Sequence, residues 1–147
     1  MKELKVYLGG AMSKCESFEE MNTWRIEIKE KLLIAAENAG YKITVVNPCD
    51  YYNFVEKRHQ SEKEIREFDL AHVMSSNIMI VNLDKLIGSD GTKQEIFKAN
   101  YCHRIPVIAF GDKQLYENLH PWIQEDITRV EKTPIDVVNY IRDFYMI

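Results

Sequence analysis

The sequence lacks the features of several large protein classes. No apolar run approaches the roughly 18 residues of a membrane span, and the first residues, Met-Lys-Glu-Leu-Lys, lack the hydrophobic region of a signal peptide. The 147 residues carry a net charge of −4 without a basic stripe, which argues against nucleic acid as a partner. Glycine and proline are scarce, and 46% of the residues are hydrophobic. We therefore expect one folded domain over residues 1–147 that binds neither membrane nor nucleic acid.

Paired cysteines and common phosphate-binding motifs are also missing. Cys15, Cys49 and Cys102 are odd in number and form no C-x-x-C pair, which is typical of reduced thiols in a cytoplasmic protein. The dipeptide Cys102-His103 lacks the spacing of metal ligands. Neither a G-x-G-x-x-G fingerprint nor a Walker A motif occurs. The sequence thus predicts no metal site, dinucleotide site or NTPase site.

Strand and helix patterns alternate along the chain. Ser17 with Glu20 and Ser61 with Glu64 form capping boxes that begin two helices, and Gly40 ends the first of them. The pattern favours an α/β fold, namely a flavodoxin-like (Rossmann-like) three-layer sandwich with a four- or five-stranded parallel sheet. The predicted strands cover residues 5–8, 41–46, 77–83, 106–110 and 129–131; the predicted helices cover 17–39, 61–75, 92–103, 115–126 and 134–145.

Polar residues and glycines follow the predicted strands. Because the carboxyl ends of parallel strands share one edge of the sheet, these residues would line the edge where ligands bind. Gly9 and Gly10 would let a ligand approach the backbone closely. The alternative is that turn-forming residues are simply common after strands. The segments are residues 9–10, 47–50, 82–84 and 111–112.

Residues 88–95, Gly-Ser-Asp-Gly-Thr-Lys-Gln-Glu, lead from the third predicted strand into a helix. We expect Asp90 and Glu95 to converge there on a small polar ligand. Thr92 and Glu95 also form a capping box, so Glu95 has an alternative interpretation as a helix cap. In either case the helix dipole would hold the Glu95 carboxylate ionised.

Asp69 shares the apolar face of its predicted helix, four residues from both Ile65 and Val73. A carboxylate that faces inward costs free energy unless it is paired or functional. The pattern leaves two alternatives open. Either Asp69 bonds to the backbone or to an arginine such as Arg66, or it is an acid that reaches the site.

Four segments resemble the nucleoside 2-deoxyribosyltransferase family, within a similarity that extends over roughly residues 4–122. They are residues 6–12, 47–51, 68–70 and 90–96. The resemblance implies a flavodoxin-like fold and transfer of a 2-deoxyribosyl group between nucleobases without a cofactor. It implies that Glu95 is the nucleophile, that Asp69 contacts or protonates the base, and that Tyr7 lies beside the nucleophile. A covalent glycosyl-Glu95 intermediate would follow the logic of a retaining glycosidase.

The resemblance also implies a set of substrate-binding residues. Gly9 would line the sugar or base pocket, and Asn47 and Asp50 belong to one of the shared segments. Asp90 would take the base-side role, or Asp84 would, because the spacing from Asp90 to Glu95 is one residue shorter than in some members.

The resemblance also implies the ligands of the protein and its assembly. Nucleosides and nucleobases would be the ligands, and the chain would form a homo-oligomer in which a neighbouring subunit contributes Asn118 or His120. Trp122 would be a subunit contact. Three aromatic residues of the segment before the second long helix would either stack on a base or pack on the sheet: Tyr51, Tyr52 and Phe54.

Two other functions remain open from the sequence. A 2′-deoxynucleoside 5′-monophosphate N-glycosidase would need a phosphate cradle, for which Ser13, Lys14 and Ser17 lie near a predicted helix N-terminus. A non-catalytic nucleotide-binding module is the second alternative, because a fold does not determine a function.

Overall fold

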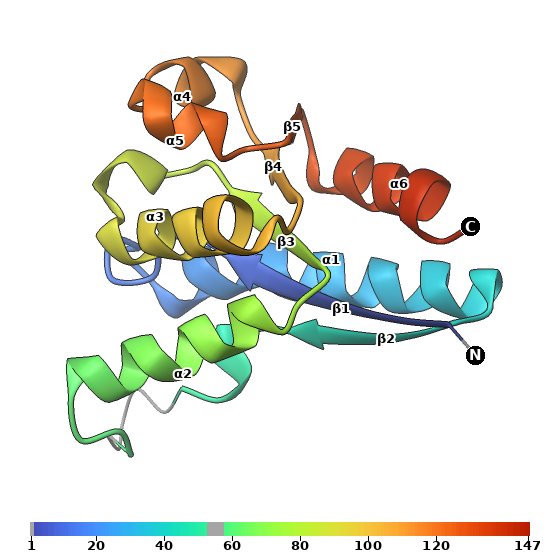
Figure 1. Cartoon of the computed structure of the whole chain (residues 1–147), viewed down its shortest axis with the longest axis horizontal. Coiled ribbons are helices and arrows are strands. Elements are labelled where there is room, and N and C mark those ends of the chain that lie inside the picture. Colours follow the sequence, from blue (N-terminus) through green and yellow to red (C-terminus); the bar gives the residue numbers. More distant parts are fainter. Residues whose placement is uncertain (1, 53–57) are drawn as a thin grey trace.

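Five parallel strands form one sheet in the computed structural model, which describes residues 2–52 and 58–147 (Figure 1). The sheet order is β2-β1-β3-β4-β5, and every neighbouring pair is parallel. This is the flavodoxin-like order, so the predicted fold class is confirmed with five strands. The strands are β1 (Lys2–Gly9), β2 (Tyr41–Val46), β3 (Ile78–Asn82), β4 (Val107–Phe110) and β5 (Arg129–Glu131).

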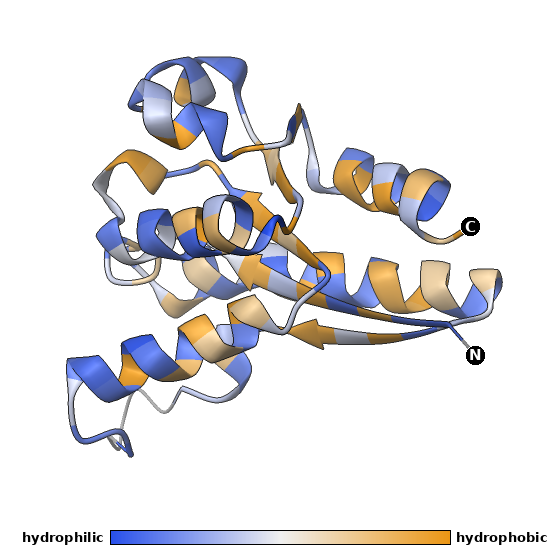
Figure 2. Cartoon of the chain, in the orientation of Figure 1, coloured by the Kyte–Doolittle hydropathy of each residue, from blue (hydrophilic) through white to orange (hydrophobic). Residues whose placement is uncertain are grey.

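Helices cover both faces of the sheet. Val6 and Leu8 pack toward α1 (Phe18–Ala39) and α6 (Pro134–Tyr145), whereas Tyr7 packs on the opposite face. That second face carries α2 (Glu62–Met74), α3 (Asp90–Ile96) and the short α4 (Lys113–Glu117) and α5 (Pro121–Glu125). The strands are therefore apolar on both sides, and Figure 2 shows β3 as a hydrophobic band between helices of mixed character.

Most helix ends follow the signals in the sequence. The Ser17 hydroxyl accepts from the N–H of Glu20 at 3.1 Å, and Ser61 repeats this contact with Glu64 at 3.1 Å. Each glutamate, however, accepts from the residue that precedes the serine, so the predicted capping boxes are only half formed. Gly40 ends α1 in the left-handed conformation at a φ of 73°, as predicted.

The helix after β3 differs from the prediction at its start, because it begins at Asp90 rather than near residue 92. Its second half is the π-helix η3 (Phe97–Cys102), and the helical stretch ends near residue 103, as predicted. Short 3-10 turns, η1 (Pro48–Asp50) and η2 (Leu86–Gly88), follow β2 and β3. Phe54, one of the aromatic residues considered for base stacking, lies outside the described residues. Within the described ranges, every helix is too short or too polar to cross a bilayer.

Candidate active site

Tyr7 and Glu95 meet at the C-terminal end of β1. The Tyr7 hydroxyl donates a hydrogen bond to Oε2 of Glu95, although the two residues are 88 positions apart in the chain. Tyr7 is 1% exposed on the face that carries α3, and α3 follows β3, the strand beside β1. After β1 the chain enters α1 on one face of the sheet, whereas after β3 it enters α3 on the other face. A doubly wound sheet binds its ligands at such a switch point.

Glu95 does not cap its helix. Ser89 is the N-cap of α3, and its hydroxyl lies 2.8 Å from that of Thr92, which is inside the first turn. The capping interpretation of Glu95 is therefore wrong, because the helix begins two residues earlier than its pattern suggests. Glu95 lies in the second turn and is half-buried, with its carboxyl turned toward Tyr7.

Burial raises the pKa of Glu95 to about 8, although the hydrogen bond from Tyr7 opposes this shift. The negative charge of Asp69 raises the pKa further, and the positive charge of Arg25 lowers it. The expectation that the helix dipole keeps Glu95 ionised is therefore wrong. The dipole acts mainly within the first turn, and desolvation is the larger effect at this position.

Asp69 is held by two tyrosines. Tyr51 donates to Oδ1 at 2.8 Å and Tyr52 donates to Oδ2 at 2.5 Å. Burial raises the pKa of Asp69, whereas these two hydrogen bonds lower it. Its partners are neither backbone groups nor Arg66, so the first of the two alternatives for Asp69 does not describe it. Besides burial, the negative charge of Asp69 raises the pKa of both Glu95 and Tyr7.

The tyrosines that hold Asp69 also contact aromatic side chains of α2 and of the segment before it. The Tyr51 ring stacks on His72 with a centroid distance of 5.6 Å and meets Phe68 edge-on at 5.0 Å. Tyr52 meets His59 edge-on at 5.8 Å. Tyr51 therefore has a packing role together with its hydrogen bond.

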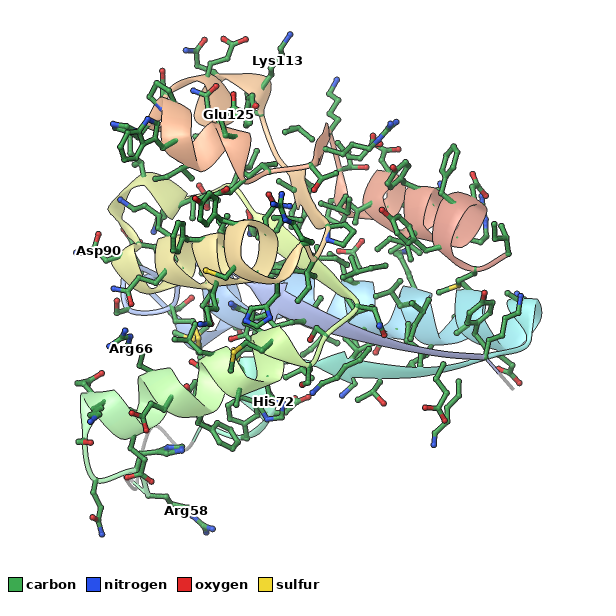
Figure 3. The ribbon with its side chains drawn as sticks, in the orientation of Figure 1. Arg58, Arg66, His72, Asp90, Lys113 and Glu125 are labelled. Carbon is green, nitrogen blue, oxygen red and sulfur yellow. The ribbon has the colours of Figure 1, made fainter. Side chains whose placement is uncertain are left out.

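Asp90 lies outside this site. It is the first residue of α3, its side chain is 93% exposed, and it pairs with Lys93 at 3.5 Å. Figure 3 shows it at the outer start of the helix. The prediction that Asp90 and Glu95 converge is wrong, because five residues correspond to about 140° of rotation around an α-helix. Asp84, the other residue considered for the base side, is also exposed.

The other polar residues after the strands stabilise local structure. The side-chain oxygens of Asn47, Asn82 and Asp112 each accept from the backbone N–H two residues further on, at 2.9 Å. These contacts match the turn-forming alternative. Asp50 is exposed and pairs with Lys29 on α1 at 3.0 Å.

Side chains of the protein fill the space beside Gly9 and Gly10. A Cβ on Gly9 would collide with the Met79 methyl group, and one on Gly10 would lie 2.8 Å from Cζ2 of Trp24. Close internal packing therefore accounts for the glycine at position 10, where the neighbour is a ring atom. At position 9 the neighbour is the flexible end of the Met79 side chain, which can shift aside.

Arg25 is a site residue that the sequence patterns did not single out. It is 0% exposed, and its guanidinium donates to the carbonyls of Gly10 at 3.1 Å and Leu8 at 3.5 Å. Burial lowers the pKa of Arg25, and nearby Glu95 opposes that shift. A signal was present, because Arg25 lies three residues before Ile28, on the apolar face of its helix. A cation at such a position is unusual.

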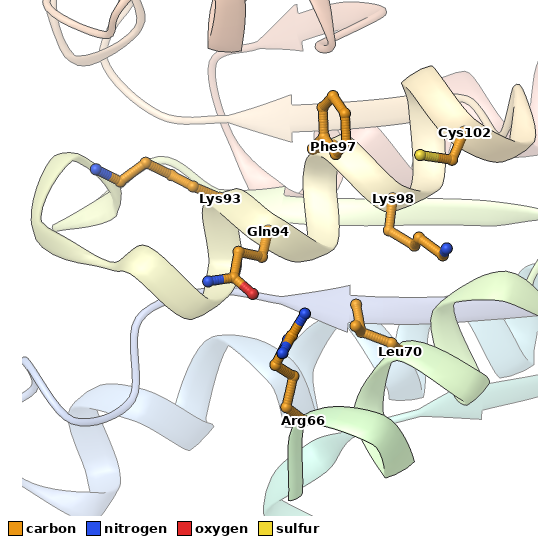
Figure 4. A pocket seen from close by; sticks show the side chains of 7 residues that line it. All are labelled: Arg66, Leu70, Lys93, Gln94, Phe97, Lys98 and Cys102. Atoms are coloured by element: carbon orange, nitrogen blue, oxygen red, sulfur yellow. The ribbon is translucent and has the colours of Figure 1, made fainter. Parts of the chain in front are cut away.

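A groove of about 600 Å³ runs between α2 and the helical stretch α3–η3, and Tyr7, Asp69 and Glu95 are not among the residues that line it (Figure 4). Arg66 and Gln94 point toward one another across it. Lys93 turns away and donates to the carbonyl of Ile87 at 2.8 Å. Within the described part of the chain, no carboxylate forms an ion pair with Arg66 or Lys98. The groove is lined by Arg66, Leu70, Lys93, Gln94, Phe97, Lys98 and Cys102, none of them acidic.

The remaining candidates have local roles or exposed positions. Ser17 is engaged as the cap of α1, while Ser13 and Lys14 are exposed. Asn118 accepts from Gln114 at 3.1 Å, and His120 caps α5 by accepting from the N–H of Trp122. Among residues 2–52 and 58–147, no group of three or more His, Cys, Asp or Glu side chains is placed to hold a metal ion.

Comparisons with known proteins support the fold. No protein-family model matches the sequence, and no curated protein matches it. A conserved protein from Enterococcus faecalis V583 superposes with a TM-score of 0.71 and 17% identity, covering 96% of this chain and 98% of the other. A CMP N-glycosidase from Clostridium botulinum superposes with a TM-score of 0.50 and 12% identity, covering 95% and 99%.

A third structural neighbour is a 2-deoxyribosyltransferase from Bacillus psychrosaccharolyticus, with a TM-score of 0.49, 19% identity and coverage of 92% and 91%. Its score is too low to add to the fold assignment. At these identities the likeness concerns the fold. The chain therefore has the α/β fold of the solved Enterococcus protein and of the CMP N-glycosidase.

Proposed function

We propose that this chain cleaves the N-glycosidic bond of 2-deoxynucleosides and transfers the 2-deoxyribosyl group to a second nucleobase, with Glu95 as the nucleophile. The hydrogen-bonded pair of Tyr7 and Glu95 at the switch point of the sheet carries this proposal. Asp69 adds a second carboxyl on the side of α2. The shared fold with a CMP N-glycosidase, an enzyme named for cleaving such a bond, supports the reaction class.

The proposed reaction has two displacements at C1′ of the sugar. In the first, a carboxylate oxygen of Glu95 bonds to C1′ while the bond from C1′ to the base nitrogen breaks and the departing base takes up a proton from Asp69. In the second, a nitrogen of the incoming base attacks C1′, loses its proton to Asp69 and releases the Glu95 carboxylate. Two inversions retain the configuration at C1′. We assign Asp69 to the nucleobase side, and Tyr7 to orienting and stabilising the Glu95 carboxylate.

The protonation of Glu95 in the free protein determines the expected pH dependence. Its pKa of about 8 means that the carboxyl is mostly protonated near neutral pH, whereas a nucleophile must be ionised. We therefore expect kcat/KM to rise as the pH increases through about 8, because this ratio reports groups of the free enzyme.

The decisive test is the pair of variants Glu95→Gln and Glu95→Ala, assayed by chromatography with a deoxynucleoside donor and a free base. We expect transfer to fall by at least about 1,000-fold, as is usual when a covalent nucleophile is removed. Glu37→Gln, at an exposed position near the end of α1, is the matched control. Acid-quenched wild-type protein should carry one 2-deoxyribosyl group on the peptide that contains Glu95. Full activity in Glu95→Ala would eliminate the nucleophile.

A second candidate function is hydrolysis of the N-glycosidic bond of 2′-deoxynucleoside 5′-monophosphates. The groove between α2 and α3 favours it, because Arg66 and Lys98 offer positive charge next to the helices that carry Asp69 and Glu95. Feeding a 2′-deoxynucleoside 5′-monophosphate without an acceptor base separates the candidates. A hydrolase releases base and deoxyribose 5-phosphate continuously, whereas a transferase without an acceptor yields little free base.

A further inference from the structure

Arg25 is fully buried, although its side chain carries a charge. Its guanidinium donates to the carbonyls of Leu8, Gly10 and Met21, and it lies 4.5 Å from the centre of the Trp24 ring. In the described ranges, no carboxylate lies within ion-pair distance of it. A buried cation without a direct counter-ion destabilises the fold unless its charge has a role. Packing alone would be served equally well by an apolar side chain of similar volume.

The contacts of Arg25 are concentrated at the end of β1. Leu8 and Gly10 flank Gly9, so the guanidinium spans the last residues of the strand that carries Tyr7. Arg25 reaches this point from α1, on the face of the sheet opposite α3. The strand end is thus held from one side by Arg25 and contacts Glu95 on the other through Tyr7.

Three charged or titratable groups influence Glu95, each from a different element. They are Tyr7 from β1, Asp69 from α2 and Arg25 from α1. Of these, Arg25 is the one that favours the ionised carboxylate through its charge. Arg25 itself faces the thiol of Cys49 at 3.9 Å, with Cys15, Tyr7 and Glu95 nearby.

We propose that Arg25 is the positioning residue of the Tyr7–Glu95 pair: it anchors the end of β1 and supplies the positive charge opposite Glu95 when that carboxylate is ionised. The effect of Arg25 on catalysis rests on the proposed function. Its effect on the ionisation of Glu95 can be measured without any substrate.

The first experiment follows the titration of the Glu95 carboxyl carbon by NMR in protein labelled with ¹³C-glutamate, assigned with Glu95→Gln. In Arg25→Met we expect the midpoint to move upward by about one pH unit, because the favourable charge is lost. Arg129→Met is the matched control. Arg129 also lies over an aromatic ring, that of Tyr140 at 4.2 Å, but it is on β5. An unmoved midpoint in Arg25→Met overturns the proposal.

Arg25→Lys tests the anchoring role. Lysine lacks the planar fork that reaches several carbonyls, so we expect kcat to fall about tenfold or more. A wild-type kcat in Arg25→Lys overturns the anchoring role and the proposal with it. If Arg25→Met does not fold, Arg25→Lys decides by the same criterion. If no variant or wild type transfers or hydrolyses, the proposed function fails, while the NMR titration still reports on Arg25 and Glu95.

Discussion

The carboxyl of Glu95 couples proton binding to folding. Its pKa in the folded protein, about 8, is above the ordinary value of 4.5 that it regains on unfolding. The folded protein therefore binds the proton more tightly. This contribution to the free energy of unfolding is fully present below pH 4.5 and is lost as the pH rises through about 8.

Glu95→Gln should remove that dependence. Glutamine retains an oxygen for the Tyr7 hydroxyl but cannot ionise, so we expect the variant to exceed wild type in unfolding free energy by about 2–4 kcal/mol at pH 8.5. Near pH 4 the two should be equal. Denaturant unfolding at both pH values measures the difference. Glu37→Gln is the control, and its unfolding free energy should change with pH as that of wild type does. A Glu95→Gln variant that is less stable at both pH values would contradict the buried, proton-bearing carboxyl.

Single residues of the site were predictable to different degrees. Asp69 was marked by its position on an apolar helix face, whereas Glu95 needed the resemblance to a family to be separated from a cap. The hydrogen bond from Tyr7 to Glu95 joins residues that are 88 positions apart, and no local periodicity encodes such a contact. Asp90 was misassigned because its proximity in sequence to Glu95 does not correspond to a shared helix face.

At the scale of elements, local patterns were informative. Gly40 ends α1, the apolar runs became strands, and Pro134 begins α6. The start of α3 was displaced because Thr92 and Glu95 imitate a capping box, while the actual N-cap, Ser89, has no side-chain capping bond. The half-formed boxes at Ser17 and Ser61 have a similar origin, because each glutamate reaches one residue too far.

The junction between β1 and α1 should be sensitive to added volume. A Cβ on Gly10 would lie 2.8 Å from a rigid ring atom of Trp24 and 3.4 Å from Arg25 Nη2. We expect Gly10→Ala to reduce the unfolding free energy by about 1–3 kcal/mol through overpacking. Gly91→Ala is the control, since its Cβ would meet nothing within 4 Å, and it should be neutral or stabilising by up to about 1 kcal/mol. Thermal unfolding compares them; equal effects would refute the steric argument.

At the scale of the whole molecule, alternation of strands and helices was enough to predict the parallel sandwich. The order β2-β1-β3-β4-β5 brings the ends of β1 and β3 together, and with them the residues of the candidate site. The opposed positions of Arg25 and Glu95, on helices that cover different faces, follow only from this assembled order. They therefore required the structure.

The predicted homo-oligomer can be tested at Trp122. Trp122 lies on α5 and is 80% exposed. Large exposed aromatic residues are typical of protein interfaces. We expect the wild-type protein to sediment as a dimer or larger assembly at micromolar concentration. For Trp122→Ser we expect the dissociation constant of the assembly to rise about tenfold or more. Phe144→Ser, at a position on α6 that is 63% exposed, is the control and should sediment like wild type. A monomeric wild-type protein would refute the prediction.

The contact among Gly10, Trp24 and Arg25 also constrains how the chain can change through evolution. Gly10 faces both side chains, and the Trp24 ring lies 4.5 Å from the guanidinium, so each position limits the volume available to the other two. A larger residue at position 10 requires compensating substitutions at 24 and 25. We therefore expect substitutions at these three positions to occur together, whereas Gly91, beside open space, can vary alone.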